Sequence, residues 1–238
     1  MTLPSRCGTL HGVGVGPGDP GLLTVKALDV IRRVPVIAYP APPQGDSMAR
    51  GIVAGYLPGG QIEIPLRMAF TSDRVSANAA YDAGAAAIAW HLVEGRDVAV
   101  LCEGDPFFFG SFMYLFARLS QQYPVEVVPG VTSVSACSAA LRVPLAALDD
   151  RVAVIPATSD EAGMEALLVS CDAAAILKAG HHLPKIVRLL DRLGLADRAS
   201  YIEYAGMASQ RIRPLAEAAR EGGPYFSMVL VHKRGDKP

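Results

Sequence analysis

The chain has 238 residues, which is enough for one large domain or two modest ones. Hydrophobic residues make up 51 % and charged residues 19 % of the sequence, a composition that supports a substantial core and excludes an intrinsically disordered chain. Lys and Arg number 22 against 23 Asp and Glu, for a net charge of -1, whereas proteins that bind nucleic-acid phosphates carry a basic surplus. We therefore expect a globular protein with a small-molecule site and no nucleic-acid partner.

The cellular location is predicted from three features of the sequence. The four cysteines form no C-x-x-C pair, which indicates reduced thiols rather than a disulfide framework or a zinc cluster. Residues 1–10 contain Pro4, Arg6 and Gly8 where a signal peptide would need an apolar run. The uncharged stretch Val127–Leu141 is too short to span a membrane. We expect a cytoplasmic protein with no membrane partner.

The first 145 residues alternate short apolar runs with helical stretches. Strands are predicted at 9–15, 34–38, 61–66, 96–102 and 125–128, and helices at 22–33 and 75–94, with a helix after each of the last two strands. This alternation predicts a mostly parallel sheet with helices on its faces. The run Val98–Cys102 is apolar throughout, as expected for a strand buried on both faces.

The segment Val143–Arg151 is the predicted linker, because the pattern restarts after it. Strands are predicted at 152–155, 173–177, 199–203 and 225–232, and helices at 161–169, 183–193 and 213–221. We therefore expect two α/β domains, residues 1–145 and 146–238, with mostly parallel or mixed sheets and the active site in the cleft between them.

Four loops at the expected carboxyl ends of strands are rich in Gly, Pro, Asp or hydroxyl residues. They are Gly14–Gly21, Glu103–Gly110, Pro129–Ser133 and Glu203–Gly206. Ligands of open parallel sheets gather at the carboxyl ends of the strands, so these loops are the candidate binding site.

The first of these loops contains Gly16–Gly21, which matches the G-x-G-x-x-G pattern of a dinucleotide site. Asp19 would place a carboxylate where pyrophosphate must approach, and Pro17 and Pro20 lack the backbone donors that such a site uses. The second strand is followed by Tyr39 rather than by the acidic residue that holds a ribose in NAD enzymes. An NAD(P)-dependent oxidoreductase is therefore the disfavoured alternative. The alternative is a structural role, in which the glycines form a tight turn and Asp19 caps the helix that follows, and we expect Asp19 to fill that role in part even if the loop also lines a site.

The second loop contains Glu103, Asp105 and three phenylalanines, Phe107–Phe109. We expect most of these rings to enter the core with the helix that follows. The Gly-Asp-Pro turn offers backbone amides and carbonyls, and its low charge suits a phosphate-free ligand with an amino-acid moiety and an adenine.

Taken together, these motifs resemble those of the tetrapyrrole methylases in order and spacing, over nearly the whole chain. They are Val13–Asp19 with Leu22–Thr24 and Ala27, Glu103–Phe107, Pro129–Ser133, Leu177–Gly180, and Glu203–Gly206 with Gln210. The resemblance implies a two-domain α/β fold, S-adenosyl-L-methionine as cofactor, S-adenosyl-L-homocysteine as product, and a homodimer.

Three further segments narrow the resemblance to the methyltransferases of corrin (cobalamin) biosynthesis. They are Ala38–Pro40, Gly45–Arg50, and Ile64–Leu66 followed by Met68. The implied reaction is methyl transfer to a meso carbon of a tetrapyrrole. Three alternatives stay open: methylation at a different ring position, a cobalt-bearing substrate, and a non-catalytic relative of the same fold. A relative that acts on ribosomal RNA is disfavoured by the net charge.

The resemblance also implies the cofactor contacts. They are Pro17, Glu103, Gly104, Asp105, Phe108, Thr132, Ser133, Lys178 and Ala205. Lys178 departs from the family, where an apolar residue such as Met is common. Its charge should therefore point away from the cofactor, or its backbone should carry the contact.

Methyl transfer from a sulfonium is an in-line displacement, so we expect positioning to be the main catalytic effect. Tyr39, Asp19, Glu103 and Asp105 are candidate bases for the departing proton, and we expect Tyr39 and Asp19 to lie nearest the substrate. The carboxylates of a tetrapyrrole need cationic partners, and the candidates are Arg50 and Arg67, which we expect on loops after strands. The alternative for each arginine is a solvated surface charge. The histidines lack metal-ligand spacing, so no metal site is predicted.

Overall fold

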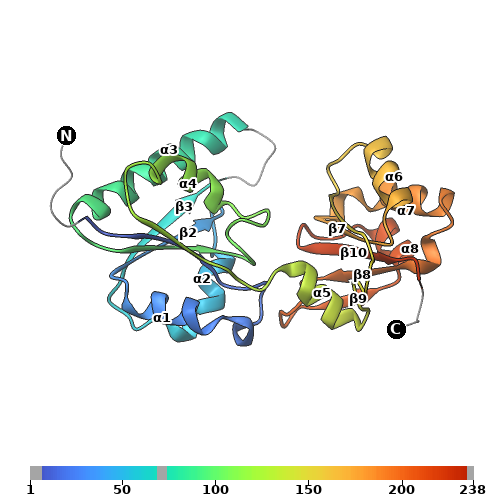
Figure 1. Ribbon diagram of the computed structural model, residues 1–238, viewed down its shortest axis with the longest axis horizontal. Helices are drawn as coiled ribbons and strands as arrows, with labels where there is room; N and C mark the ends of the chain where they lie inside the picture. Colours follow the sequence, from blue (N-terminus) through green and yellow to red (C-terminus); the bar gives the residue numbers. More distant parts are fainter. Residues whose placement is uncertain (1–6, 69–73, 235–238) are drawn as a thin grey trace. The chain divides into compact units, whose positions relative to one another are not determined.

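The computed structural model describes residues 7–68 and 74–234, and the chain forms two compact units, residues 1–132 and 133–238 (Figure 1). Each unit has its own five-stranded sheet with helices on both faces. The N-terminal residues 1–6, where we found no signal-peptide pattern, lie outside the described part of the chain. Within the described ranges, no helix is both long enough and apolar enough to cross a bilayer.

The first sheet has the strand order β3-β2-β4-β1-β5, and all its pairings are parallel. Its strands are β1 (Leu10–Gly14), β2 (Val36–Ala41), β3 (Ile62–Arg67), β4 (Val98–Cys102) and β5 (Val125–Val128). Because the strands are parallel, their carboxyl ends meet at one edge of the sheet. The loops after β1, β4 and β5 therefore share that edge, and β2 and β3 end there as well.

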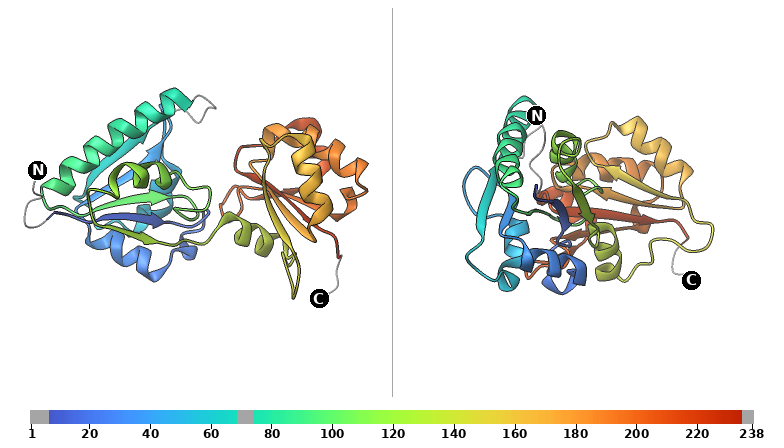
Figure 2. Two further views of the ribbon diagram at one scale, coloured as in Figure 1. Left: turned by 45° about the horizontal axis from the view of Figure 1, so that its top comes forward. Right: turned by 60° about the vertical axis from the view of Figure 1, so that its left-hand side comes forward.

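Two helix layers cover this sheet, as Figure 2 shows. Its helices are η1 (Pro20–Leu22), α1 (Val25–Arg33), α2 (Met48–Val53), η2 (Ala54–Tyr56), α3 (Arg74–Val93) and α4 (Phe112–Leu119). On one face, Ile88 of α3 and Phe112 of α4 pack in a core with Val98 and Val100 of β4. On the other face, α1 and α2 pack on the alternate residues of the strands. Both faces of the central strands are thus buried, which explains their unbroken apolar sequence.

The helix predicted from residue 22 begins at Val25 instead, because the Thr24 hydroxyl accepts a hydrogen bond from the Ala27 amide at 3.1 Å and caps the helix there. Val25 is 77 % exposed, whereas Ala27, Val30 and Ile31 of the same helix are buried. The buried face of α1 is therefore formed by Ala27, Val30 and Ile31, and Val25 lies outside it.

Strand β2 continues through Tyr39 and Pro40, where a loop was expected. Pairing between β2 and β4 ends at Ala38, and the residues that follow pair with β3 alone. Pro40 thus lies where only one neighbour needs backbone donors, a position that a strand tolerates.

Helix α2 was not predicted, and it moves Arg50 from the expected loop into a helix. The Ser47 hydroxyl accepts a hydrogen bond from the Arg50 amide at 3.2 Å and caps this helix. Ala49 and Val53 anchor it in the core below the sheet. Arg67 is likewise not in a loop, because it is the last residue of β3.

The second sheet has the strand order β6-β7-β10-β8-β9 and is mixed. Its strands are β6 (Val152–Pro156), β7 (Ala173–Leu177), β8 (Ala199–Glu203), β9 (Arg211–Arg213) and β10 (Ser227–His232). Strands β6 and β7 are parallel, and β10 runs antiparallel to both β7 and β8. The carboxyl ends of β7 and β8 therefore meet the beginning of β10 at one edge.

The helices of the second unit divide between the two faces of its sheet. They are α5 (Ser133–Leu141), α6 (Glu161–Ser170), η3 (Gly180–His182), α7 (Leu183–Arg192), η4 (Ala196–Arg198) and α8 (Leu215–Glu221). Residues of α6, α7 and α8 share one core, and α5 packs on the opposite face.

The division of the chain falls between Thr132 and Ser133 rather than at the expected 145/146 boundary. Val134 and Cys137 of α5 are buried against the second sheet, beside Ile202 of β8. Since α5 thereby belongs to the second unit, the expected linker lies inside that unit and not before it.

Candidate functional site

Three glycine-containing loops meet backbone to backbone at the carboxyl edge of the first sheet. The Gly104 amide donates to the Gly16 carbonyl at 2.8 Å, and the Gly16 amide donates to the Gly104 carbonyl at 3.3 Å. A β-carbon on Gly14 would lie 2.5 Å from the Gly130 nitrogen, which leaves no room for a side chain. The glycines thus bring three of the four predicted loops together at the carboxyl ends of the parallel strands, where ligands were expected to bind.

Asp105 joins the second of these loops to the third. One carboxylate oxygen accepts hydrogen bonds from the amides of Phe107 and Phe108, at 2.9 and 3.1 Å. The other accepts one from the Gly130 amide at 3.1 Å. Both oxygens thus satisfy backbone donors, so Asp105 shapes this edge rather than offering a free carboxylate.

Glu103 connects the same loop to helix α2. Its Oε1 accepts a hydrogen bond from the Ala49 amide in the first turn of that helix, at 3.1 Å. Burial raises the pKa of Glu103, and the amide donor acts in the opposite direction. Gly104 is buried directly after it, within hydrogen-bonding distance of Gly16.

The three phenylalanines of the second loop do not enter the core as expected. Phe107, Phe108 and Phe109 are 48, 37 and 45 % exposed, and the ring that fills the core is Phe112 of α4. Phe107 packs edge-on against Phe116 of α4, with 5.2 Å between ring centroids. An exposed aromatic surface, including Phe108, therefore lies beside the glycine loops.

The other predicted residues of this edge differ in their surroundings. Pro17 is buried, and Thr132 is half-buried at the end of the first unit, while Ser133 begins α5. Asp19 is exposed, and its Oδ1 accepts a hydrogen bond from the Gly21 amide at 2.8 Å. Asp19 therefore caps the short η1 turn, and Thr24 caps α1 in its place.

A cavity of about 370 Å³, the β2–β3 pocket, lies where strands β2 and β3 end. It is lined by Tyr39, Ala41, Gly45, Asp46, Ser47, Arg50, Gly51, Pro65 and Arg67. The pocket thus brings together three residues that the sequence predicted separately, Tyr39, Arg50 and Arg67. Asp19 is not among its lining residues.

A carboxylate missed by sequence reasoning, Glu63, connects two residues of this pocket. The Tyr39 hydroxyl donates to Oε2 of Glu63 at 2.6 Å. Arg50 donates from Nε to Oε2 at 3.2 Å and from Nη2 to Oε1 at 3.0 Å. The period of two along β3 places Glu63 and Arg67 on the same face, and that alternation could have identified Glu63.

These contacts set the protonation of the pocket. Hydrogen bonds from Arg50 and from Tyr39 hold the pKa of Glu63 below its usual range. Burial, followed by the bond to Glu63, raises the pKa of Tyr39. Tyr39 is therefore a neutral phenol near pH 7 and a poor general base.

The other arginine of the pocket, Arg67, donates to the carbonyls of Pro42 and Pro43, at 3.0 and 3.4 Å.

The second unit presents Lys178 and Ala205 at the corresponding edge of its own sheet. Lys178 follows β7 and Tyr204 follows β8, and both have positive φ, 61° and 49°. The Lys178 ammonium lies 5.3 Å from the centroid of the Tyr225 ring. This cation–π contact directs the charge onto an aromatic ring of the protein itself. Ala205 is buried beside Tyr204.

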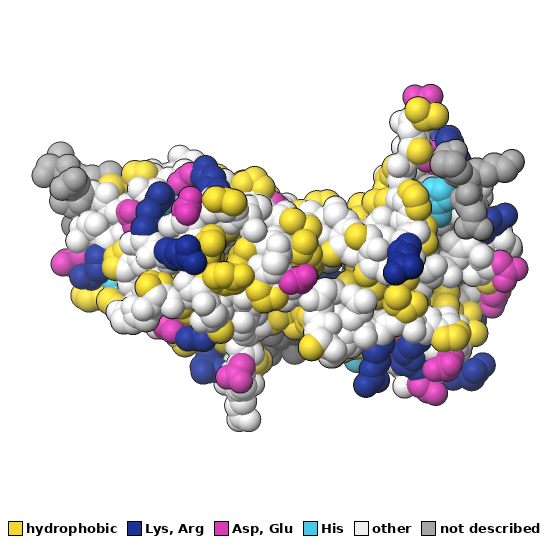
Figure 3. Space-filling view, turned by 90° about the horizontal axis from the view of Figure 1, so that it is seen from below, with side chains coloured by type: hydrophobic (Ala, Val, Ile, Leu, Met, Phe, Trp, Pro, Cys, Tyr) yellow, Lys and Arg dark blue, Asp and Glu magenta, His cyan; other side chains and the backbone are white. Residues whose placement is uncertain are grey.

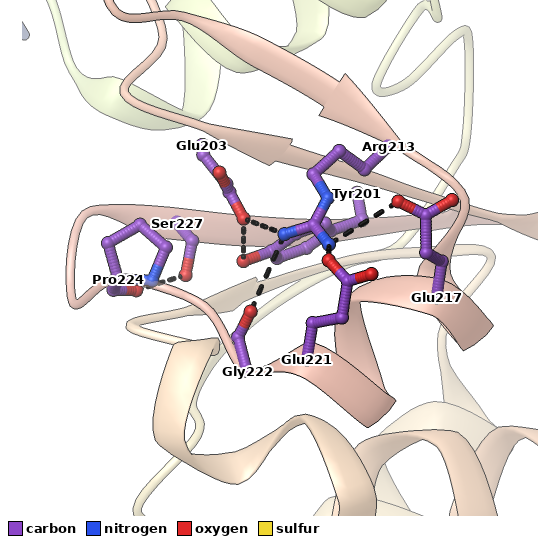
Figure 4. Close-up of polar contacts among 8 residues, drawn as sticks. All are labelled: Tyr201, Glu203, Arg213, Glu217, Glu221, Gly222, Pro224 and Ser227. Atoms are coloured by element: carbon purple, nitrogen blue, oxygen red, sulfur yellow. Dashed lines mark hydrogen bonds and ion pairs between the residues drawn. The ribbon is translucent and has the colours of Figure 1, made fainter.

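A buried ion-pair network anchors the end of β8 (Figure 4). Glu203 is 3 % exposed, and its Oε1 accepts hydrogen bonds from Arg213 Nη1 and from the Tyr201 hydroxyl, both at 3.1 Å. Arg213 also donates to Glu217 and Glu221 of α8. Arg213 lies in β9, where the beginning of a helix was expected, and Pro214 separates it from α8. The network fixes the strand that leads to Tyr204 and Ala205.

Charge on the molecular surface is mixed. On the face shown in Figure 3, acidic and basic side chains are interspersed among apolar ones. Across the ranges 7–68 and 74–234, no group of three or more His, Cys, Asp or Glu side chains is placed to hold a metal ion.

The sequence matches a family model over most of its length. That model, Tetrapyrrole (Corrin/Porphyrin) Methylases, matches residues 9–219. The chain is 43 % identical to a precorrin-2 C(20)-methyltransferase of Sinorhizobium sp, over 97 % of this chain and 98 % of that protein. It is 32 % identical to a cobalt-precorrin-2 C(20)-methyltransferase of Salmonella typhimurium, over 95 % of this chain and 97 % of that protein.

The fold also has a solved counterpart. A uroporphyrin-III C-methyltransferase from Thermus thermophilus, crystallised with S-adenosylhomocysteine, superposes with a TM-score of 0.67. The match covers 95 % of this chain and 92 % of that one at 24 % identity. The comparisons confirm both the predicted α/β fold and the predicted methyltransferase family. The chain therefore belongs to the tetrapyrrole (corrin/porphyrin) methylases.

Proposed function

We propose that the chain transfers a methyl group from S-adenosyl-L-methionine to C20 of precorrin-2 in cobalamin biosynthesis. The observation that carries the proposal is the 43 % identity to a precorrin-2 C(20)-methyltransferase over nearly the full length of both chains. The β2–β3 pocket supports it, because Arg50 and Arg67 supply two guanidinium groups for a substrate with several carboxylates.

The loops at the carboxyl edge of the first sheet suit a phosphate-free nucleoside with an amino-acid group. Their backbones meet too closely at Gly14 for any side chain there, and the exposed ring of Phe108 offers an apolar surface beside them. When bound, S-adenosylmethionine supplies an electrophilic methyl group on a sulfonium. Its proposed contacts are Pro17, Glu103, Gly104, Asp105, Phe108, Thr132, Ser133, Lys178 and Ala205.

Catalysis rests mainly on positioning, since displacement at a methyl carbon needs the nucleophile held in line. The neutral Tyr39 phenol serves as a hydrogen-bonding group in the β2–β3 pocket rather than as a base. Among the two predicted catalytic residues, this leaves Asp19 as the acceptor for the C20 proton. Its carboxylate is exposed and lies outside the lining of the β2–β3 pocket, so C20 would have to face the glycine loops rather than the interior of that pocket. Asp19→Asn should therefore slow the release of that proton while leaving S-adenosylhomocysteine binding intact.

Methyl transfer to precorrin-2 tests the proposal directly. Wild-type protein is incubated with S-adenosylmethionine and either precorrin-2 or its cobalt-bearing form, and the methylated carbon is identified by NMR. Methylation at C20 of precorrin-2 supports the proposal. Methylation at another ring position contradicts it. Activity with the cobalt-bearing substrate alone would favour the second candidate, which the 32 % identity to the Salmonella enzyme supports.

Binding measurements distinguish the methyltransferase from an oxidoreductase and from a non-catalytic protein of the same fold. Isothermal titration with S-adenosylhomocysteine and with NADPH separates the first two. Binding of S-adenosylhomocysteine without any methyl transfer would indicate a non-catalytic relative. The homodimer and the cytoplasmic location stay predictions, and light scattering of the purified protein tests the first of them.

A further inference from the structure

The pairing of Glu63 with Arg50 decides which part of the Arg50 guanidinium faces a ligand. A guanidinium has two edges that bind a carboxylate with two parallel hydrogen bonds, Nε with Nη2 and Nη1 with Nη2. Glu63 occupies the first edge, through Nε at 3.2 Å and Nη2 at 3.0 Å. The second edge remains, because neither contact with Glu63 uses Nη1 of Arg50.

Glu63 also fixes the orientation of the Tyr39 hydroxyl. The same oxygen that accepts from Nε of Arg50 accepts from that hydroxyl at 2.6 Å. The phenolic hydrogen is thereby directed at Glu63, and the lone pairs of its oxygen are left for other donors. Tyr39 and Arg50 both line the β2–β3 pocket, whereas Glu63 reaches them from beyond the lining residues.

We propose that Glu63 is a positioning residue, which holds Arg50 so that its Nη1–Nη2 edge binds one carboxylate side chain of the tetrapyrrole in the β2–β3 pocket. The inference rests on the proposed function and adds to it a residue that never touches the substrate. Glu63 and Arg50 are about one-third exposed, so the pair contributes little to folding and its role is orientation.

The test compares Glu63→Gln with wild type in the full-length protein. Glutamine keeps the shape but cannot accept from both donors of Arg50, so the guanidinium loses its fixed plane. The KM for precorrin-2 should rise about tenfold, the effect of losing one oriented charge-assisted hydrogen bond, and kcat should change less than about twofold. The Kd for S-adenosylhomocysteine should stay at the wild-type value.

A double variant separates orientation from a general effect of charge. In Arg50→Ala the substrate contact is already absent, so adding Glu63→Gln should produce no further rise in KM. Glu161→Gln is the matched control, because Glu161 forms an exposed pair with Arg192 at 2.6 Å in the second unit. This control should leave both kinetic constants unchanged.

Three results would overturn the inference. They are an unchanged KM in Glu63→Gln, an equal rise in KM in the Arg50→Ala background, and a loss of kcat alone. Thermal melting of each variant distinguishes a folding defect from a change in substrate binding. If wild type itself transfers no methyl group to precorrin-2, the proposed function fails, whatever the variants do.

Discussion

Gly130 and Gly104 approach each other so closely that a β-carbon on Gly130 would lie 2.1 Å from the Gly104 carbonyl oxygen. The contact joins the loops after β5 and β4, and both loops lie within the segment that matches the family model. Backbone, unlike a flexible side chain, cannot move aside without opening the edge that we propose binds the cofactor.

Gly130→Ala should therefore destabilise the first unit by at least about 2 kcal/mol, because overpacking at a rigid backbone forces the loops apart. S-adenosylhomocysteine binding, measured by titration calorimetry, should weaken more than about tenfold. Gly55→Ala is the control, since no atom lies within 4 Å of the added carbon. Normal binding by Gly130→Ala would show that the close approach is not needed for the cofactor.

Asp105→Ala should weaken S-adenosylhomocysteine binding about tenfold, because three backbone amides of two loops lose their acceptor. Asp160→Ala provides a matched control in the second unit. Asp160 also accepts from a backbone amide, that of Gly163 at 2.7 Å, but it caps α6 away from the proposed contacts. The control should lower stability by about 1 kcal/mol and leave the Kd unchanged. An unchanged Kd in Asp105→Ala would remove this residue from the proposed site.

The buried network at the end of β8 predicts that removing Arg213 lowers the Tm far more than removing the exposed Arg192. Arg213→Met leaves the carboxylate of Glu203 buried without its cation, and it should lower the Tm by roughly 10 °C. Arg192→Met breaks the pairs with Glu161 and Glu165 at an exposed site and should lower the Tm by less than about 3 °C. Equal shifts in calorimetry would mean that burial does not decide the strength of these pairs.

The burial of His11 predicts that the stability of the protein depends on pH. His11 is buried in β1, 3.0 Å from Glu126 and 3.9 Å from Asp97, with Lys26 and Arg33 also paired to Glu126. Burial lowers the pKa of His11 despite the two carboxylates. Between that lowered pKa and about 6.5, the unfolded chain binds a proton that the native state does not, so stability falls as pH falls.

Urea unfolding between pH 7.5 and 5.5 measures the slope of the free energy of unfolding against pH. His11→Gln should reduce it by up to about 1.4 kcal/mol per pH unit within that window. Glu126→Gln removes a carboxylate that favours the charged imidazole, and it should extend the sloping region to lower pH. A slope in His11→Gln equal to that of wild type would assign the dependence to other groups, such as His91 and His182.

Most of the fold could be predicted from the sequence because the central strands are buried on both faces. In a chain where strands and helices alternate, the apolar run Val98–Cys102 predicts a buried strand, and it forms β4. Helix α2 was missed because it is less than two turns long and contains Gly51, so its signal was a single cap at Ser47. The unit boundary was misplaced for a related reason, since nothing in the composition of α5 reveals which sheet it packs on.

The sequence pointed to single residues of the β2–β3 pocket but not to the contacts between them. The predicted arginines and Tyr39 meet in one pocket, yet the carboxylate between two of them, Glu63, lies outside every motif. The three phenylalanines after Asp105 read as core residues by composition. They stay partly exposed because the amides of Phe107 and Phe108 donate hydrogen bonds to the Asp105 side chain. Phe112 is the phenylalanine that is buried in the core instead.

Substitution of Lys178 tests whether its proposed contact with the cofactor is made by the backbone alone. Its ammonium lies over the Tyr225 ring, and its φ of 61° sets the course of the chain between β7 and Ala179. Lys178→Met keeps a long side chain, so S-adenosylhomocysteine should bind within about twofold of wild type, while loss of the cation–π contact should cost roughly 0.5–1 kcal/mol in stability. Tyr225→Leu removes the same contact from the other side and should reproduce that loss of stability. If Lys178→Met instead lost tenfold or more in binding while Tyr225→Leu did not, the ammonium group itself would have to contact the cofactor.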